Sequence, residues 1–445
     1  MTDHARRRAP LTERERADEL AAYARDERAI AGVERLRFFP LAVRARASAR
    51  PGTLTAASGR ELIDLSASWT ASGLAHPAIG HAIADAARSM AGASVLSAAG
   101  ERATRLAERL IELVPVRGRA RAYLGLAGTD ANDVALRAAR AATGRNRVLA
   151  FEGSYHGGLG LAQAISGLSG RAEPAALLPY PADASALEAL PWRIAAAHEE
   201  EPVAAIIVEP IQCDGGVRVP PAGLLLGLRA ACDEIGALLI VDEVKTGLGR
   251  TGTLLASEAE AAAGAIPDLV TLGKSLGGGL PVSAAIGDER LLGAPPASAL
   301  LTAAGADVPC AAALAALELA ASPELAEAVR SRALELDAML EAFAGGASPG
   351  AALLGQTRGR GLLRGLALAG NAQRDAEMLT AKAAYRAWEL GAIAYPVQGG
   401  VLEITPPLAI SGEDLAEGIA RLLQAIDDVA EGAVPDAAIT SFAGW

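Results

Sequence analysis

Short apolar runs alternate with longer amphipathic segments through the middle of the chain. The runs with the length and composition of buried strands cover residues 122–126, 147–151, 203–208, 237–241, 269–272 and 282–286. Helical periodicity lies between several of them and is clearest over 131–142 and 223–235. Strands that alternate with helices in this way are typical of a mostly parallel sheet with crossover connections. The pattern therefore predicts an α/β core.

The last part of the chain has a different pattern, with long helical stretches around short strands at 361–366 and 401–404. This pattern predicts a smaller α+β domain. We expect a large domain over residues 76–315 and a C-terminal small domain over 316–445. We also expect the N-terminal segment, residues 1–75, to contribute to the small domain.

Composition narrows the possible partners. The chain has 445 residues, 51% hydrophobic and 21% charged, with a net charge of -11. An acidic chain whose arginines are interleaved with acids does not favour nucleic acid, and no apolar run reaches the ~18 residues of a membrane span. The first 50 residues carry no apolar leader, so we expect a cytoplasmic protein. The three cysteines have no metal-ligand spacing, and we expect no metal site.

Lysine is scarce in this chain. Of 41 basic residues only Lys245, Lys274 and Lys382 are lysines. A genomic preference for arginine codons explains the scarcity without any function. Lysine nevertheless does what arginine cannot, because its amine can lose a proton and form a Schiff base with a carbonyl group.

Polar residues follow three of the expected strands. The segments are 209–216, 242–245 and 273–275, and they include Asp214, Asp242 and Lys274. In open α/β sheets, ligands bind beyond the carboxyl ends of the strands. One crevice can therefore gather all three segments.

Two phosphate-binding motifs are weak here. Residues 247–252 match GxGxxG, but five residues separate them from the strand and no helix clearly begins at the third glycine. Residues 273–275 resemble the end of a Walker A loop, although Asp268 stands where that loop needs glycine. The segment 125–132 is a better candidate, because it follows a strand and begins a helix whose free N–H groups attract an anion. An ordinary helix cap at Thr129 or Asp130 is the alternative.

The combination of residues favours pyridoxal 5'-phosphate (PLP). Asp242 at a strand end keeps a pyridine nitrogen protonated, Lys274 forms the Schiff base, and Tyr155 offers a ring for stacking. Each has an ordinary alternative, since Asp242 can be a turn residue or an ion-pair partner and Tyr155 can be a packing residue. A phosphate cradle, an aromatic residue, an acid and a lysine, each after its own strand, are more specific than any one of them.

These segments together resemble a known family. The chain is similar over nearly its whole length to the class III aminotransferases, which are fold type I PLP enzymes. The segments that carry the resemblance are 128–132, 143–145, 155–157, 209–212, 242–244, 249–252, 272–274 and 405–408. The resemblance implies a fold type I large domain with a mostly parallel sheet, PLP as the cofactor, and a homodimer with shared active sites.

The resemblance also implies roles for individual residues. Lys274 becomes the Schiff-base lysine, and Asp242 pairs with the ring nitrogen. Thr302 reaches the phosphate bound by the neighbouring subunit. The other implied cofactor contacts are Tyr155 and Val244 on the two faces of the ring, Gly128 and Thr129 on the phosphate, and Glu209.

Within that family the chain most resembles the α-amino-ε-caprolactam racemases. The resemblance rests on segments 36–41, 59–66 with Trp69, 212–216, 242–245, 401–403 and 442–445. It departs from the family at Ala127, where serine is usual, and at residues 306–307, where Asn-Pro is usual. These departures concern the expected phosphate contacts and the match at Thr302.

Two residues favour racemisation over transamination. Glu403 stands where many carboxylate-binding members carry an arginine, and an acid there repels a substrate carboxylate but not a neutral lactam or amide. Asp214 offers a second acid/base group besides Lys274, with its pKa open to tuning by Lys245, and a plain turn residue is the alternative. Trp69, Tyr155 and Lys245 are expected to line the substrate pocket.

The sequence therefore predicts a PLP-dependent racemase of α-amino lactams or α-amino acid amides. It acts through a Schiff base between substrate and cofactor and removal of the Cα proton. The alternatives that stay open are an aminotransferase that uses a keto acid, an amino acid epimerase, and a non-catalytic protein that has the PLP fold or binds a nucleotide. Arginines 358, 360 and 364 of the small domain are the candidates for binding a carboxylate in the aminotransferase.

Overall fold

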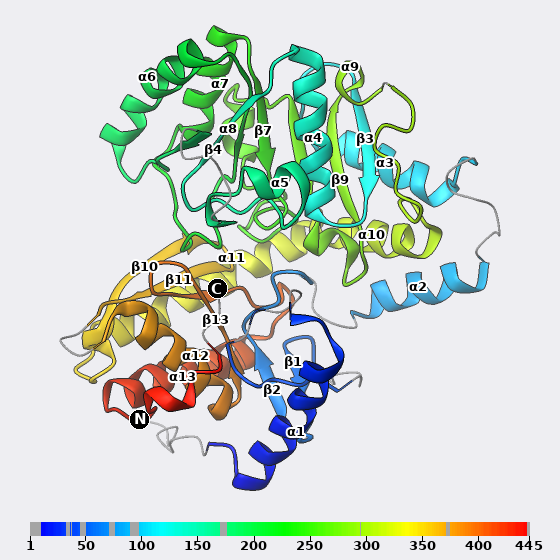
Figure 1. Cartoon of the computed structure of the whole chain (residues 1–445). Helices are drawn as coiled ribbons and strands as arrows, with labels where there is room; N and C mark the ends of the chain where they lie inside the picture. The colour runs from blue at the N-terminus through cyan, green and yellow to red at the C-terminus, as the bar shows by residue number, and fades with distance from the viewer. Residues whose placement is uncertain are drawn as a thin grey trace. The chain divides into compact units, whose positions relative to one another are not determined.

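The computed structural model describes residues 10–32, 36, 38–44, 50–70, 76–89, 98–169, 176–293, 295–370 and 374–442 (Figure 1). Arg37 and residues 443–445, which entered the resemblance above, lie outside the described residues. The described residues within Met1–Ala67 and Ala328–Trp445 form one compact unit, and those within Ser68–Ser72 and His76–Glu327 form the other. The domain limits expected from the sequence stay a prediction, which we retain as a proposal.

A seven-stranded sheet of described residues forms the centre of the larger unit. In the order in which the strands pair, they are β3 (Ala120–Gly125), β9 (Ser283–Asp288), β8 (Leu269–Leu272), β7 (Leu238–Asp242), β6 (Val203–Val208), β4 (Arg147–Phe151) and β5 (Leu177–Leu178). The strands from β8 to β5 pair in parallel, whereas β9 is antiparallel to both β8 and β3. The predicted mostly parallel sheet is confirmed.

Each face of this sheet buries its own set of apolar side chains, because successive residues of a strand point to opposite faces. Ala205, Ile207 and Ile240 pack with Leu136 of α4 (Gly128–Thr143), whereas Ile206 packs on the other side with the core that includes α7 (Leu224–Ile235). This double burial explains why β6 is apolar along its whole length. The periodicity predicted α4 and α7 to within a few residues.

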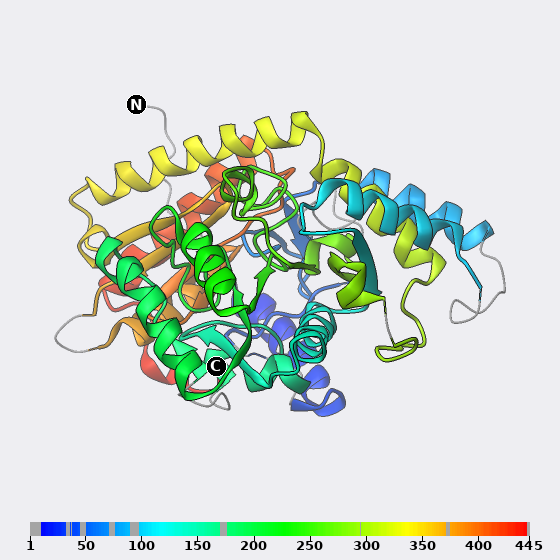
Figure 2. The same ribbon diagram turned by 90° about the horizontal axis from the view of Figure 1, so that it is seen from above.

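The other helices of the larger unit surround this sheet. They are α2 (Pro77–Ser89), α3 (Glu101–Leu113), α5 (Gly160–Ala164), α6 (Ala184–Glu200), α8 (Glu258–Ala262), α9 (Glu289–Leu292) and α10 (Asp307–Ala320), with short 3-10 turns at Gly167–Ser169 and Lys274–Gly277. Figures 1 and 2 both show α6 and α7 side by side. Arg145 joins this layer to the sheet, because its Nη1 donates to the carbonyl oxygens of Val203, Ile235 and Gly236.

The smaller unit contains two sheets among its described residues. An antiparallel sheet has the order β10 (Leu354–Arg360), β11 (Leu363–Leu368), β14 (Val401–Ile404) and β13 (Tyr395–Val397). A second sheet has the order β1 (Thr53–Thr55), β2 (Glu61–Asp64) and β12 (Ala392–Ile393). The second sheet pairs the N-terminal segment with the C-terminal part of the chain, since β12 runs parallel to β2.

Helices of the smaller unit are α1 (Glu13–Ala29), α12 (Ala376–Leu390) and α13 (Gly412–Ala430), with 3-10 turns at Ala351–Leu353 and Asp436–Ala438. The long helix α11 (Pro323–Ala344) runs across the boundary between the units. In the described part of the chain no single helix is long and apolar enough to cross a membrane. One bent pair of helices, Asp307–Ala320 with Pro323–Ala344, meets that test by length and composition only.

Candidate active site

A cavity of about 220 Å³ opens in the larger unit, where the residues that follow β6, β7 and β8 come together. It is lined by Gly128, Thr129, Asn132, Tyr155, His156, Gly157, Glu209, Asp214, Asp242, Val244, Lys245, Thr246 and Lys274. The three strand-end segments singled out in the sequence therefore do meet in one crevice. The physical reason is the parallel sheet, in which the carboxyl ends of neighbouring strands lie at the same edge.

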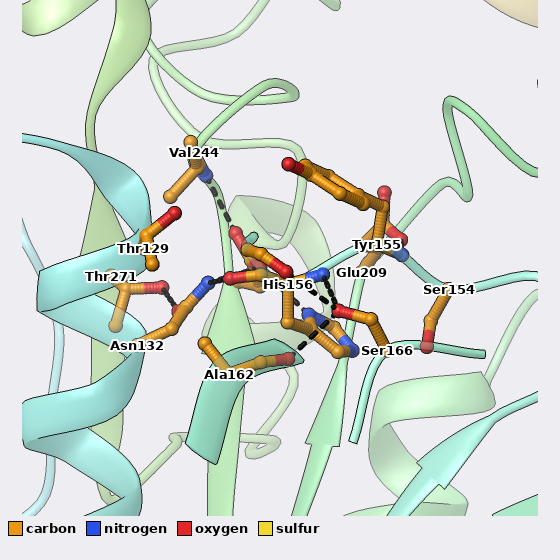
Figure 3. A network of polar contacts seen from close by, with 12 residues as sticks. Thr129, Asn132, Ser154, Tyr155, His156, Ala162, Ser166, Glu209, Val244 and Thr271 are labelled. Carbon is orange, nitrogen blue, oxygen red and sulfur yellow. Dashed lines mark hydrogen bonds and ion pairs between the residues drawn. The ribbon is translucent and has the colours of Figure 1, made fainter. Parts of the chain in front are cut away.

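Asp242, the last residue of β7, is buried and held by three hydrogen bonds. Its Oδ2 accepts from Asn132 Nδ2 at 2.8 Å and lies 2.8 Å from His156 Nδ1, while its Oδ1 accepts from the Val244 N–H at 3.0 Å. Figure 3 labels these three partners. Thr271 on β8 in turn donates its hydroxyl hydrogen to Asn132 Oδ1 at 2.6 Å. Donors from three different segments therefore fix the position of this carboxylate.

Sequence reasoning gave no role to Asn132 and His156, although both stood inside the quoted motifs. Asn132 lies on the first turns of α4, where a side chain three or four residues after Gly128 and Thr129 shares their face of the helix. His156 directly follows Tyr155. The helical spacing was the signal available for Asn132, whereas nothing in the sequence indicated that His156 turns toward Asp242.

Lys274 follows β8 and has φ +40°, in the left-handed region that residues other than glycine rarely adopt. Such backbone strain clusters at functional sites, where the surrounding structure holds it. The preceding Gly273 lies against the start of α4, since a Cβ there would lie 3.1 Å from the Gly128 Cα. Glycine at this position lets the strand end approach the helix closely enough for Lys274 to line the cavity.

The N-terminus of α4 forms another side of the cavity. Gly128 leaves room for Val244, because a Cβ at residue 128 would lie 2.5 Å from the Val244 Cγ1. Asp130 orders the turn before the helix by accepting from the N–H groups of Leu126 at 2.8 Å and Ala127 at 3.2 Å. Thr129 Oγ1 accepts from the Gly158 N–H at 3.4 Å. A helix N-terminus beside a cavity favours a negatively charged group there.

Asp214 lies in the loop after β6 and forms an ion pair with Lys245, with 2.8 Å between Oδ1 and Nζ. Both side chains are largely buried, with exposed fractions of 15% for Asp214 and 7% for Lys245. Burial alone would raise the pKa of Asp214. The positive charges of Lys245 and Lys274 and the hydrogen bond from Lys245 outweigh burial and lower that pKa below its ordinary value.

Glu209, which directly follows β6, is the third carboxylate of the cavity. Its Oε1 accepts from the Tyr155 N–H at 3.0 Å and its Oε2 from the Cys213 N–H at 3.2 Å. Burial raises the pKa of Glu209 to about 7, an effect that the neighbouring His156 reduces and Asp242 reinforces. Glu209 thus joins the segment that carries Tyr155 to the loop that carries Asp214.

Three other residues expected at the site lie elsewhere. Trp69 is half exposed and Thr302 is exposed, and neither lines the cavity. Glu403 is buried on β14 of the smaller unit. Tyr155 does line the cavity, and burial raises the pKa of its hydroxyl. The expected roles of Trp69, Thr302 and Glu403 stay predictions.

Comparison with known proteins agrees with this geometry. The sequence profile of the family "Aminotransferase class-III" matches residues 42–426. A leucine/methionine racemase of Thermococcus litoralis is 38% identical over 368 residues, which are 76% of this chain and 80% of the relative. An acetylornithine aminotransferase of Streptomyces coelicolor is 36% identical over 385 residues, 85% of this chain and 90% of the relative.

Solved structures agree with the sequence comparisons. An ornithine aminotransferase of Toxoplasma gondii, with PLP at partial occupancy in its active site, superposes with a TM-score of 0.78. It is 25% identical and covers 92% of this chain and 94% of its own. The chain belongs to the class III aminotransferase family and has the fold type I architecture. Its cofactor is PLP, and its substrates are small amino-acid-like molecules.

Proposed function

We propose that this chain is a PLP-dependent racemase that inverts the Cα of a small, neutral α-amino compound. The α-amino lactams and α-amino acid amides are the first candidates, followed by free apolar amino acids. The observation that carries this proposal is the Asp214–Lys245 pair, which lines the same cavity as Lys274. A racemase must take a proton from one side of Cα and return one to the other, so two acid/base groups in one cavity suit that reaction.

The cavity fits PLP. Its donor set combines an amine at Lys274, a fixed carboxylate at Asp242, and a helix N-terminus at Gly128 where a Cβ would collide with Val244. We propose that Lys274 holds the cofactor covalently, that Asp242 pairs with its ring nitrogen, and that Gly128 and Thr129 contact its phosphate. When bound, PLP supplies an electron sink for the charge left at Cα after deprotonation.

The remaining cofactor contacts keep the roles implied by the family resemblance. Tyr155 and Val244 line the cavity and are proposed to contact the faces of the ring, with Glu209 beside them. Thr302 is exposed within one chain, and its proposed role requires the phosphate site of a second subunit. We therefore propose a homodimer with shared active sites.

In the proposed reaction this chain's residues move two protons. Lys274, once the substrate amine has displaced it, removes the Cα proton through Nζ. The Asp214–Lys245 pair returns a proton to Cα and so produces the opposite configuration. Asp242 takes part in neither proton transfer, and its three hydrogen bonds hold it in place.

Substrate choice rests on charge. Glu403 gives the small domain a buried acid at the position where a bidentate arginine would bind a carboxylate. An α-amino lactam or an amide avoids that repulsion. Trp69, Tyr155 and Lys245 are proposed to contact this substrate. The leucine/methionine racemase among the relatives makes free leucine and methionine the matched test of this preference.

An aminotransferase is the second candidate. The acetylornithine aminotransferase of S. coelicolor is nearly as similar as the racemase and covers more of this chain. Transamination needs one acid/base group, Lys274, and a keto acid whose carboxylates are bound by arginine. Arg358, Arg360 and Arg364 of β10 and β11 are the proposed donors.

Chiral chromatography of the purified enzyme with PLP tests the two candidates. The substrates are L-α-amino-ε-caprolactam, a panel of L-amino acid amides, L-leucine and L-methionine, with no keto acid present. We expect D product over many turnovers, and none from the Lys274→Ala variant. Absence of D product, together with amine transfer after pyruvate or 2-oxoglutarate is added, would overturn the racemase proposal and support the aminotransferase.

A further inference from the structure

Two of the chain's three lysines meet in one cavity. The sequence uses arginine for 38 of its 41 basic residues, yet both Lys245 and Lys274 line the PLP site. The third, Lys382, is buried in the smaller unit, where it donates to the Val434 carbonyl oxygen and pairs with Asp436. Lys274 needs an amine to bind an aldehyde. The ion pair of Lys245 with Asp214 sets no such requirement, because a guanidinium pairs with a carboxylate at least as well.

The loop that carries Asp214 is rigidly held. Gln212 and Arg218 exchange two backbone hydrogen bonds, the Gly216 and Val217 N–H groups both donate to the Cys213 carbonyl oxygen, and Val217 has φ +49°. Gly215 packs so closely that a Cβ there would lie 2.3 Å from the Gly153 carbonyl oxygen. These contacts fix the position of Asp214 opposite Lys245.

In the Asp214–Lys245 pair, the neighbouring charges favour the state in which Lys245 holds the proton. The charge of Lys245 and its hydrogen bond lower the pKa of Asp214 despite burial, and the charge of Lys274 adds to this effect until that amine binds PLP. Asp214 is therefore a carboxylate at neutral pH and has no proton to give at rest. The Lys245 ammonium, 2.8 Å away, does have one.

We propose that Lys245 is a second acid/base residue of the reaction and that the proton returned to Cα comes from its ammonium group. This inference rests on the racemase function proposed above. One N–H bond of Lys245 breaks and one Cα–H bond forms, so that Lys245 ends the step as a neutral amine and Asp214 remains a carboxylate. Lys274 has gained the proton taken from Cα. Exchange with water then removes that proton and returns one to Lys245, so the enzyme is ready for the next turnover.

Lys245→Arg tests this role directly. Arginine keeps the positive charge and the hydrogen bond to Asp214 but does not release a proton. We expect racemisation to fall by about 10²–10⁴-fold, the usual contribution of a general acid/base group. In D₂O the variant should still exchange the Cα hydrogen of one enantiomer, through Lys274, with retained configuration and within about tenfold of the wild-type rate.

Three results would contradict the proposal. Racemisation by Lys245→Arg within about tenfold of wild type would show that Lys245 supplies only charge to Asp214. If racemisation and Cα–H exchange were lost in parallel, the role of Lys245 would not be limited to the return of the proton to Cα. The absence of D product with the wild type would overturn the proposed function itself, and the wild-type measurement reveals this outcome separately.

Two further measurements show whether each variant is folded and binds PLP. The absorbance of bound PLP and the thermal unfolding temperature are recorded for each variant. Lys245→Gln, which keeps a hydrogen-bond donor for Asp214 without an acidic proton, should give the same loss of racemisation with exchange retained. Lys382→Arg is the matched control, since it makes the same change outside the cavity, and it should racemise at the wild-type rate.

Discussion

Asp242 and Asp214 are two carboxylates of one cavity that are held in opposite ways. Asp242 accepts hydrogen bonds from Asn132, His156 and the Val244 N–H, which come from three segments of the chain. Asp214 is paired with Lys245, whose ammonium can lose its proton. In the proposed reaction the first carboxylate is a fixed partner of the PLP ring nitrogen, whereas the second belongs to the pair that moves a proton. Hydrogen-bond partners, more than residue type, therefore separate a fixed counter-ion from an acid/base group.

Among three variants of the cavity's carboxylates, Asp242→Asn is expected to have the largest effect. The variant loses the charge proposed to pair with the PLP ring, and its amide hydrogens meet groups that already donate. We expect racemisation and Cα–H exchange in D₂O both to fall by about 10³-fold, measured with saturating PLP. Asp268→Asn is the control, because Asp268 is also a buried acid but binds Arg229 away from the cavity. Activity of Asp242→Asn within tenfold of wild type would refute the proposed role.

Asp214→Asn should have a smaller and more selective effect. An amide oxygen still accepts from Lys245, but the negative charge that fixes the ammonium is lost. We expect racemisation to fall by about 10²-fold, while the Cα hydrogen of one enantiomer still exchanges with solvent deuterium. Nuclear magnetic resonance of each pure enantiomer in D₂O measures both rates. If the rates of racemisation and of Cα–H exchange fell equally, Asp214 would not differ from Asp242 in its role in the reaction.

The smallest effect is expected for Glu209→Gln. It concerns the free energy of unfolding and how that free energy depends on pH. Burial raises the pKa of Glu209 to about 7 in the folded chain, whereas its ordinary value is 4.5. Between these values the folded state binds more protons than the unfolded state, so this group's contribution to stability is lost as pH rises. Relative to the variant, the wild type should lose about 2–3 kcal/mol of unfolding free energy between pH 5 and pH 8.

Urea unfolding of both proteins without added PLP, at pH 5 and at pH 8, measures this difference. The variant is expected to be less stable than wild type at pH 5, because its amide nitrogen cannot accept the hydrogen bond that Cys213 or Tyr155 donates to the carboxylate. The change of the unfolding free energy with pH is measured separately from this loss of stability at pH 5. An unchanged difference between the two proteins at the two pH values would show that Glu209 is ionised in the folded state at pH 5.

The sequence predicted strands correctly where a short run of neighbouring residues is enough to define them. Strands β4, β6, β8 and β14 begin and end at the expected residues, because each is a short apolar run bounded by residues that break the pattern. Strand β7 begins and ends one residue later than expected. The two-residue strands β5 and β12 were missed, since two residues carry no period and pair only because the fold brings their partners near.

The sequence by itself determined the apolar strands of a mostly parallel sheet, the order of the residues that follow them, and membership of the class III aminotransferase family. It did so because the alternation of apolar runs, and motif segments such as 128–132, 242–244 and 272–274 that carry the family resemblance, can be seen without coordinates. Only the tertiary structure decided that Asn132 and His156 hold Asp242 and that Lys245 faces Asp214. These contacts join residues 31 to 110 positions apart, and packing of the sheet against its helices sets them.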